Sequence, residues 1–128
     1  RNPRRNKKNA GSSPPVSCIC IPGGQSERLE EAIYSFLQQD YPGQKELIIL
    51  NDNPGQFLEF DHSEITIVNL PEPFSQPGQR YNTAAALCTH DLIFLWDDDG
   101  IYLPHCISFS IEKFGKSKGF FKATKAFV

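Results

Sequence analysis

Residues 92–100 read LIFLWDDDG, an apolar run followed at once by three aspartates. Short runs of large apolar side chains are typical of strands that are buried on both faces. Three adjacent carboxylates repel one another at such a strand end unless a cation or several N–H donors offset their charge. Carboxylate oxygens suit hard cations such as Mg²⁺ and Mn²⁺, so the stretch indicates a buried strand that ends in a candidate metal site. An exposed acidic turn that caps the next helix is the alternative interpretation.

Further apolar runs and amphipathic stretches precede and follow this strand. The runs at 16–21, 46–50 and 65–70 are also expected to be buried strands. Between Glu27 and Gln39 the apolar residues recur on one face of a helix. Other helices are expected at Gln56–Phe60, as a short turn of helix, at Arg80–Cys88 and from Pro104 to Lys113. This alternation predicts an α/β fold with a mostly parallel sheet flanked by helices on both faces.

Polar clusters follow three of the four expected strands, at 22–26, 51–53 and 97–99. In parallel α/β sheets, ligands bind beyond the carboxyl ends of the strands, so these clusters are expected to converge on one site. Asp52 is placed to accept hydrogen bonds from a base or a ribose, although an Asx turn at this position explains it equally well. Arg80, which follows Gly78 at a helix start, is placed to face a diphosphate; an ordinary surface arginine is the alternative.

The 128-residue chain has a net charge of −2 that hides a strong charge separation. Residues 1–15 contain five basic and no acidic side chains, and residues 113–128 contain five lysines and no acid, so the middle holds all 15 acidic residues. We expect 1–15 to be a disordered basic tail and 16–128 to form one domain. No apolar run approaches the roughly 20 residues of a membrane-spanning helix. We therefore expect a cytoplasmic protein that binds no nucleic acid and contacts anionic surfaces, if at all, through its tail.

The spacing of the cysteines and the absence of several short motifs exclude some classes of function. Cys18, Cys20, Cys88 and Cys106 lack C-x-x-C spacing, and Cys18 and Cys20, which share one strand face, are expected to be small core side chains. Trp96 is expected in the core beside the site. The sequence contains no P-loop, no G-x-G-x-x-G after the first strand and no G-x-S-x-G elbow, so these nucleotide-binding and hydrolase classes lose their main support.

Three segments of the chain resemble family 2 glycosyltransferases with the GT-A fold. They read VSCICIP at 16–22, EEAIYSFLQQDYPGQKELIILNDN at 30–53 and GQRYNTAAALCTHDLIFLWDDDGIYLP at 78–104. The resemblance runs from about Val16 to Lys113 and covers the nucleotide-sugar-binding half of such domains. It implies transfer of a sugar from a nucleotide donor, expected to be a UDP-sugar, to a hydroxyl of a saccharide or another acceptor, with inversion.

The resemblance also implies roles for individual residues. Asp52 matches the family's base-binding acid, and Arg80 and Asn82 match positions near the donor diphosphate. The three aspartates match the family's D-x-D segment, which binds ribose and a divalent metal, Mn²⁺ or Mg²⁺. Within it, Asp99 is the expected metal ligand together with Asp97, and Asp97 or Asp98 is expected nearer the ribose.

The chain departs from the family's pattern at several positions. The turn Ile21-Pro22-Gly23-Gly24 lacks the family's uracil contacts, Asn51 replaces a usual first aspartate, and Gly100 replaces a frequent fourth acid. The catalytic base, which the family carries in a following half, has no counterpart here, so the domain is expected to be incomplete at its C-terminal side. A non-catalytic GT-A-like remnant that binds a nucleotide or a partner is therefore the alternative hypothesis.

Overall fold

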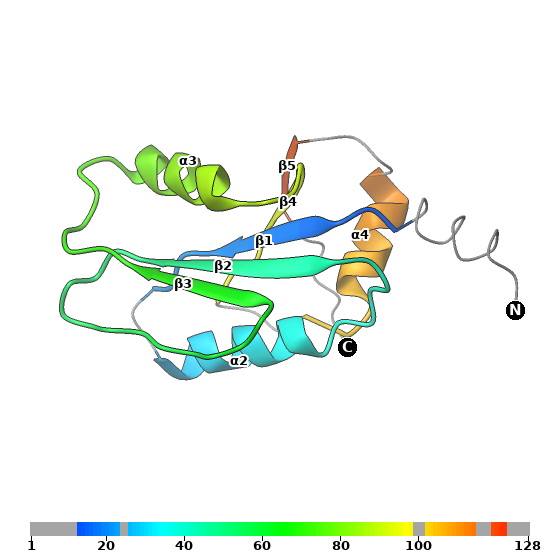
Figure 1. The fold of residues 1–128 in the computed structure, drawn as a ribbon, viewed down its shortest axis with the longest axis horizontal. Coiled ribbons are helices and arrows are strands. Elements are labelled where there is room, and N and C mark those ends of the chain that lie inside the picture. Colours follow the sequence, from blue (N-terminus) through cyan, green and yellow to red (C-terminus); the bar gives the residue numbers. More distant parts are fainter. Residues whose placement is uncertain (1–12, 24–25, 99–101, 115–118, 123–128) are drawn as a thin grey trace, which may run out of the picture.

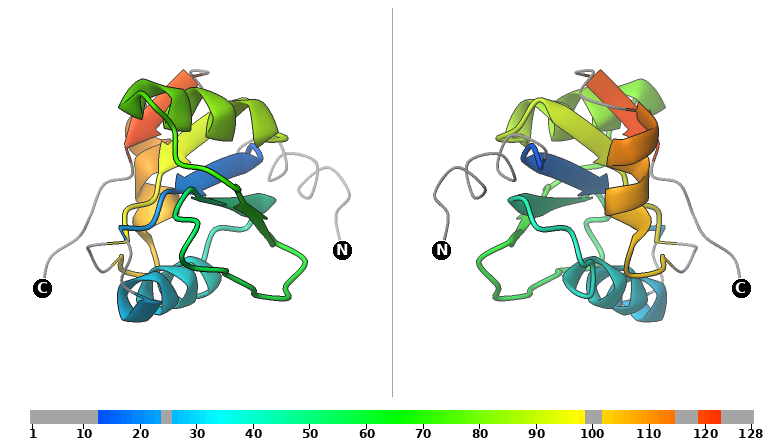
Figure 2. Two further views of the ribbon diagram at one scale, coloured as in Figure 1. Left: turned by 90° about the vertical axis from the view of Figure 1, so that its left-hand side faces the viewer. Right: turned by 90° about the vertical axis from the view of Figure 1, so that its right-hand side faces the viewer.

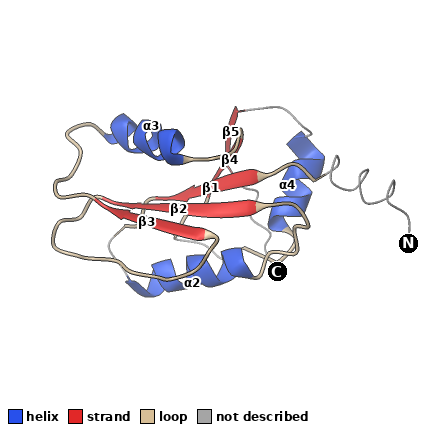
Figure 3. Ribbon diagram, viewed as in Figure 1, coloured by secondary structure: helices blue, strands red, loops and turns tan. Residues whose placement is uncertain are grey.

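The structure is a computed structural model that describes residues 13–23, 26–98, 102–114 and 119–122. Its five strands are β1 (Val16–Cys20), β2 (Lys45–Asn51), β3 (Ile65–Asn69), β4 (Leu92–Leu95) and β5 (Gly119–Lys122). Its helices are α2 (Ser26–Leu37), α3 (Pro77–Leu87) and α4 (Cys106–Phe114). The strands form one sheet in the order β3-β2-β1-β4-β5, and every neighbouring pair is parallel (Figure 1, Figure 3).

The helices cover both faces of the sheet, which confirms the α/β architecture predicted from the sequence. Figure 2 shows α3 and α2 on opposite faces. The larger core cluster joins α2 and α4 to one face through residues such as Phe36, Phe94 and Ile107. The smaller cluster joins Ala84 of α3 to the other face, where Ile48 is among the buried side chains. The near-continuous apolar strands are explained by this burial on both faces.

Trp96 anchors the end of β4 in the larger core, as expected. Its ring is fully buried and meets Phe36 of α2 edge-on, with centroids 6.0 Å apart. The indole Nε1–H of Trp96 donates a hydrogen bond to the Ala32 carbonyl, at 2.9 Å. The buried ring thus has its polar atom satisfied and fixes α2 against the start of the aspartate segment.

The burial of Cys18 and Cys20 in the larger core confirms their predicted role as small core side chains. Cys18, Cys20 and Cys106 are buried in the core, and Cys88 is half-buried at the end of α3; none of the four is in a disulfide. Burial raises the pKa of the Cys88 and Cys106 thiols to about 11. The Cys88 and Cys106 thiols are therefore neutral at pH 7 and pack as small apolar side chains.

Several element boundaries differ from those predicted. The expected short helix at Gln56–Phe60 is wrong: this segment is not helical. The helix α3 begins at Pro77 because proline suits the first helical turn. Pro104 lies in a turn, so α4 starts later than predicted, at Cys106. β5 was not predicted, and it extends the sheet beyond β4.

The predicted basic tail enters the described structure only through residues 13–15. The Tyr41 hydroxyl donates a hydrogen bond to the Pro14 carbonyl, and the Ser13 carbonyl lies close to Gly43. Residues 1–12 lie outside the described residues. Among the helices that the structure describes, none is long and apolar enough to cross a membrane.

Candidate functional site

The parallel sheet brings two of the predicted polar clusters into direct contact. The strands β1 and β4 are neighbours, and the Trp96 backbone N–H extends their pairing by donating to the Ile19 carbonyl, at 2.7 Å. Beyond the paired region, the Gly23 N–H donates a hydrogen bond to Oδ2 of Asp98, at 2.8 Å. The loop after β1 and the aspartates after β4 therefore meet at the carboxyl edge of the sheet, as the sequence predicted.

Tyr102 supports the aspartate segment, a role that the sequence analysis missed. Its ring stacks on Trp96, with centroids 3.9 Å apart and an interplanar angle of 20°. Its hydroxyl accepts a hydrogen bond from the Asp97 backbone N–H, at 2.9 Å. Burial chiefly raises the pKa of Tyr102, so this hydroxyl stays protonated. Trp96 and Tyr102 together fix the start of the aspartate segment at Asp97.

The two aspartates that the structure describes, Asp97 and Asp98, are half-buried above the core. The thiol of Cys20 lies near them, and its pKa is raised mainly by burial and further by the Asp98 and Asp97 carboxylates. Asp99, the expected metal ligand, lies outside the described residues. Among the residues that are described, no group of three acid, histidine or cysteine side chains is placed to hold a metal ion.

Asp52 and Arg80, two predicted site residues far apart in sequence, form an ion pair. Nε of Arg80 lies 3.0 Å from Oδ2 of Asp52, and the side chains are 40% and 12% exposed. The two atoms face each other without hydrogen-bond alignment, and neither has a hydrogen-bond partner among the described residues. The two facing atoms are buried against each other, so the pair is closed to solvent at this point.

The position of Arg80 in the first turn of α3 makes that helix end electropositive. The first turn contains no acidic residue, and the N-cap residue Gln76 makes no side-chain capping bond. A helix N-terminus with unsatisfied N–H groups attracts anions, and an arginine beside it adds to the attraction. Asn82, the other residue expected near the diphosphate, is exposed on the same helix.

Asn51 has a structural role that explains why it is not an aspartate. It is 3% exposed, and its Nδ2 donates to the Gln56 carbonyl at 2.6 Å and to Oδ1 of Asn69 at 2.9 Å. Its Oδ1 accepts the Asn53 N–H at 3.1 Å. Only an amide supplies both donors and an acceptor here. Asn51 therefore shapes the loop that carries Asp52.

Asn69 completes this network and was also missed. It pairs with Asn51 in the β2–β3 register, accepts the Leu58 N–H at 2.9 Å and donates to the Leu58 carbonyl at 2.8 Å. A polar residue at the carboxyl end of the third strand was visible in the sequence. Asn69 would have been found by examining the carboxyl end of this strand for polar residues, as was done for the other strands.

These observations place the protein among α/β proteins with a parallel sheet, and they show polar side chains gathered at its carboxyl edge. The chain belongs to glycosyl transferase family 2, whose model matches residues 18–123. The resemblance seen in the sequence is thereby confirmed. No curated protein sequence matches the chain.

The fold is similar to that of TarS from S. aureus in two crystal structures. Each match covers 77% of this chain, with a TM-score of 0.60 and 16% sequence identity. The chain covers 32% of the structure of TarS residues 1–349 and 19% of the second TarS structure. The chain therefore spans about a third of the first TarS structure and about a fifth of the second.

Proposed function

We propose that the carboxyl edge of the sheet binds a nucleoside-diphosphate sugar as the donor in a glycosyl transfer. The observation that carries the proposal is the ion pair between Asp52 and Arg80, because both residues were expected at the donor and the pair joins the loop after β2 to the first turn of α3. The contact between Gly23 and Asp98 supports it, since it closes the same edge of the sheet.

In this proposal each residue has a defined role toward the donor. Asp52 accepts N–H groups of the base, while Arg80 and the N-terminus of α3 attract the diphosphate, with Asn82 next to them on the helix. Asp98, already oriented by the Gly23 N–H, is suited to accept a ribose hydroxyl, and Asp97 is the alternative for that contact. A UDP-sugar is the proposed donor, and the hydroxyl of a saccharide or another acceptor attacks with inversion.

The residues at the end of β4 fit a divalent metal by their chemistry. Asp97 is half-buried, and Asp97 and Asp99 would supply carboxylate oxygens, of which one or two suffice when a diphosphate supplies the remaining ligands. When bound, Mn²⁺ or Mg²⁺ neutralises charge on the leaving diphosphate. The chain's own contribution is to fix the backbone at Asp97 through Trp96 and Tyr102.

A second candidate function is nucleotide binding without transfer. Asn51 is fully engaged in the loop network instead of offering a carboxylate, and the catalytic base has not been assigned to any residue. General-base catalysis contributes typically ~10²–10⁴-fold, so its absence would leave a binding module. UDP release from UDP-sugars in the presence of acceptors separates the two functions.

The proposal is tested by calorimetric titration of UDP with excess MnCl₂ into the wild type, Arg80→Ala and Asp99→Ala. The matched controls are Lys113→Ala, in the last turn of α4, and Asp61→Ala, which remove exposed charges away from the strand-end site. We expect both site variants to lose about tenfold or more in affinity, the range of a charge-assisted contact to phosphate or metal, while both controls bind like the wild type. Absence of UDP binding by the wild type, or equal binding by the site variants and their controls, would overturn the assignment.

A further inference from the structure

The connection between β2 and β3 contains no helix, although parallel strands are usually joined through one. Residues 52–64 form this connection, and Asn69 clamps Leu58 through two hydrogen bonds to its backbone. The segment around Leu58 therefore runs over the β3 end of the sheet on the side of α2. A non-helical segment covers less of the sheet than a helix would, and an apolar groove results.

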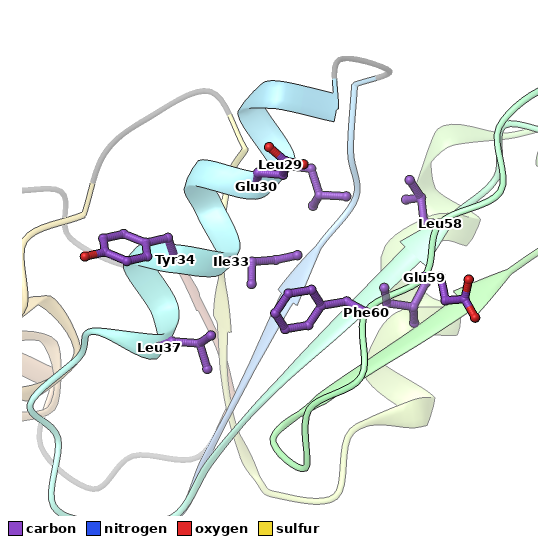
Figure 4. Close-up of a pocket in the computed structure, with 9 residues that line it drawn as sticks. Leu29, Glu30, Ile33, Tyr34, Leu37, Leu58, Glu59 and Phe60 are labelled. Carbon is purple, nitrogen blue, oxygen red and sulfur yellow. The ribbon is translucent and has the colours of Figure 1, made fainter.

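This groove lies between α2 and residues 58–60 and has a volume of about 340 Å³. Its apolar lining comes from both sides and from β3, and consists of Leu29, Ile33, Leu37, Leu58, Phe60 and Ile67. Figure 4 shows Ile33 and Phe60 pointing toward each other across the groove. Phe60 is 41% exposed and Tyr34, on the outer side of α2, is 66% exposed. Large exposed aromatic side chains beside an apolar hollow are typical of interaction sites.

The rim of the groove is acidic. Glu30 of α2 and Glu59 of the opposite wall line it directly. Glu27, Glu30 and Glu31 line an adjoining hollow of about 560 Å³, which shares Tyr34 with the groove.

Neither Glu30 nor Glu59 takes part in the ion pairs found among the described residues, Lys45–Glu64 and Arg80–Asp52. Lys45 is bound to Glu64 at 2.8 Å and lies over the Phe36 ring, and Arg28 is exposed on α2. An apolar floor between carboxylates is complementary to apolar side chains flanked by lysine or arginine.

We propose that this groove binds a basic amphipathic helix of a partner protein, in the place that a crossover helix would otherwise take. Helices bind grooves of this kind by inserting apolar side chains spaced three and four residues apart. The lysines or arginines of such a helix would face Glu30 and Glu59, and its apolar side chains would contact Ile33 and Phe60. The proposal concerns a different surface from the strand-end site and does not depend on the proposed glycosyl transfer.

The test measures binding of a fluorescein-labelled peptide, LKKLLKLLKKLLKL, by fluorescence anisotropy. The groove variant is Glu30→Lys with Glu59→Lys, and its matched control is Glu72→Lys with Glu112→Lys, two exposed glutamates outside the groove. Both double variants have the same net charge. A difference in their peptide affinity therefore reports the charges at the rim of the groove and not the total charge of the protein. We expect the groove variant to bind about tenfold or more weakly than the control, because the two attractive contacts at positions 30 and 59 become repulsive.

A third variant, Phe60→Ser, tests the apolar part of the groove, and we expect it to bind about fivefold or more weakly. The four glutamates that are replaced by lysine lie at exposed positions. The two double variants therefore still test the proposal if Phe60→Ser does not fold. The proposal is overturned if the wild type does not bind at about 100 μM peptide, or if both double variants lose affinity equally. A dimer that Phe60→Ser abolishes would assign the groove to a second copy instead. A gain in peptide affinity on deletion of residues 1–12 would assign it to the chain's own tail.

Discussion

Replacing Asn51 by aspartate is expected to destabilise the folded chain by about 3 kcal/mol at pH 7. The substitution is nearly isosteric, and it introduces the acid that the family resemblance led us to expect at this position. The new carboxylate still accepts the Asn53 N–H, but it has no donor for the Gln56 carbonyl or for Oδ1 of Asn69. An oxygen would instead face these acceptors across 2.6 and 2.9 Å.

The magnitude follows from the contacts that are lost. Each hydrogen bond contributes about 1 kcal/mol net, and the part-buried Gln56 carbonyl loses the partner that Asn51 supplies, which costs about 1 kcal/mol or more. Oδ1 of Asn69 keeps the Leu58 N–H and adds little further. The destabilisation should be smaller at pH 4 than at pH 7, since a protonated carboxyl group can donate one hydrogen bond.

The assay is urea unfolding followed by the fluorescence of Trp96, the single tryptophan, with the wild type measured at each pH. Asn53→Asp is the matched control: Asn53 is exposed and its Oδ1 only accepts the Gly55 N–H, a role that a carboxylate also fills. A loss below about 1 kcal/mol for Asn51→Asp, or an equal loss for both variants, would refute the account of this network.

Two further predictions concern the glycines and the buried thiols. Gly43→Ala should lower the free energy of unfolding by about 1–3 kcal/mol, because the new Cβ would lie 2.5 Å from the Ser13 carbonyl oxygen. Gly78→Ala on α3 should raise it by up to about 1 kcal/mol, because the new Cβ meets nothing within 4 Å and alanine favours a helix. Thermal unfolding measures both, and shifts of the same sign would contradict the packing around Gly43. Stability should also fall between pH 9 and 11, because burial raises the pKa of the Cys88 and Cys106 thiols from 9.0 to about 11, so the unfolded chain loses protons that the folded chain retains. A urea midpoint that does not change across this range would contradict it.

The elements of the fold could be predicted because their signals are local. The strands β1, β2 and β4 are short apolar runs, and the apolar face of α2 repeats with the period of a helix. The wrongly predicted helix at Gln56–Phe60 shows the limit of this approach. There, side chains from the ends of β2 and β3 fix the backbone of Gln56 and Leu58, and no pattern within the segment reports that constraint.

The sequence alone determined the class of fold, the family resemblance and the candidate residues Asp52, Arg80 and Asp97–Asp99, because these depend on residue type and spacing along the chain. Only the tertiary structure decided which of them meet. Asp98 contacts Gly23 because β1 and β4 are neighbours, and Arg80 contacts Asp52 where the start of α3 comes up against the loop after β2. The groove beside α2 was likewise invisible in the sequence, since it is formed by a segment whose path is fixed by Asn69. Such contacts depend on strand order and on bonds between distant residues, which the local pattern does not contain.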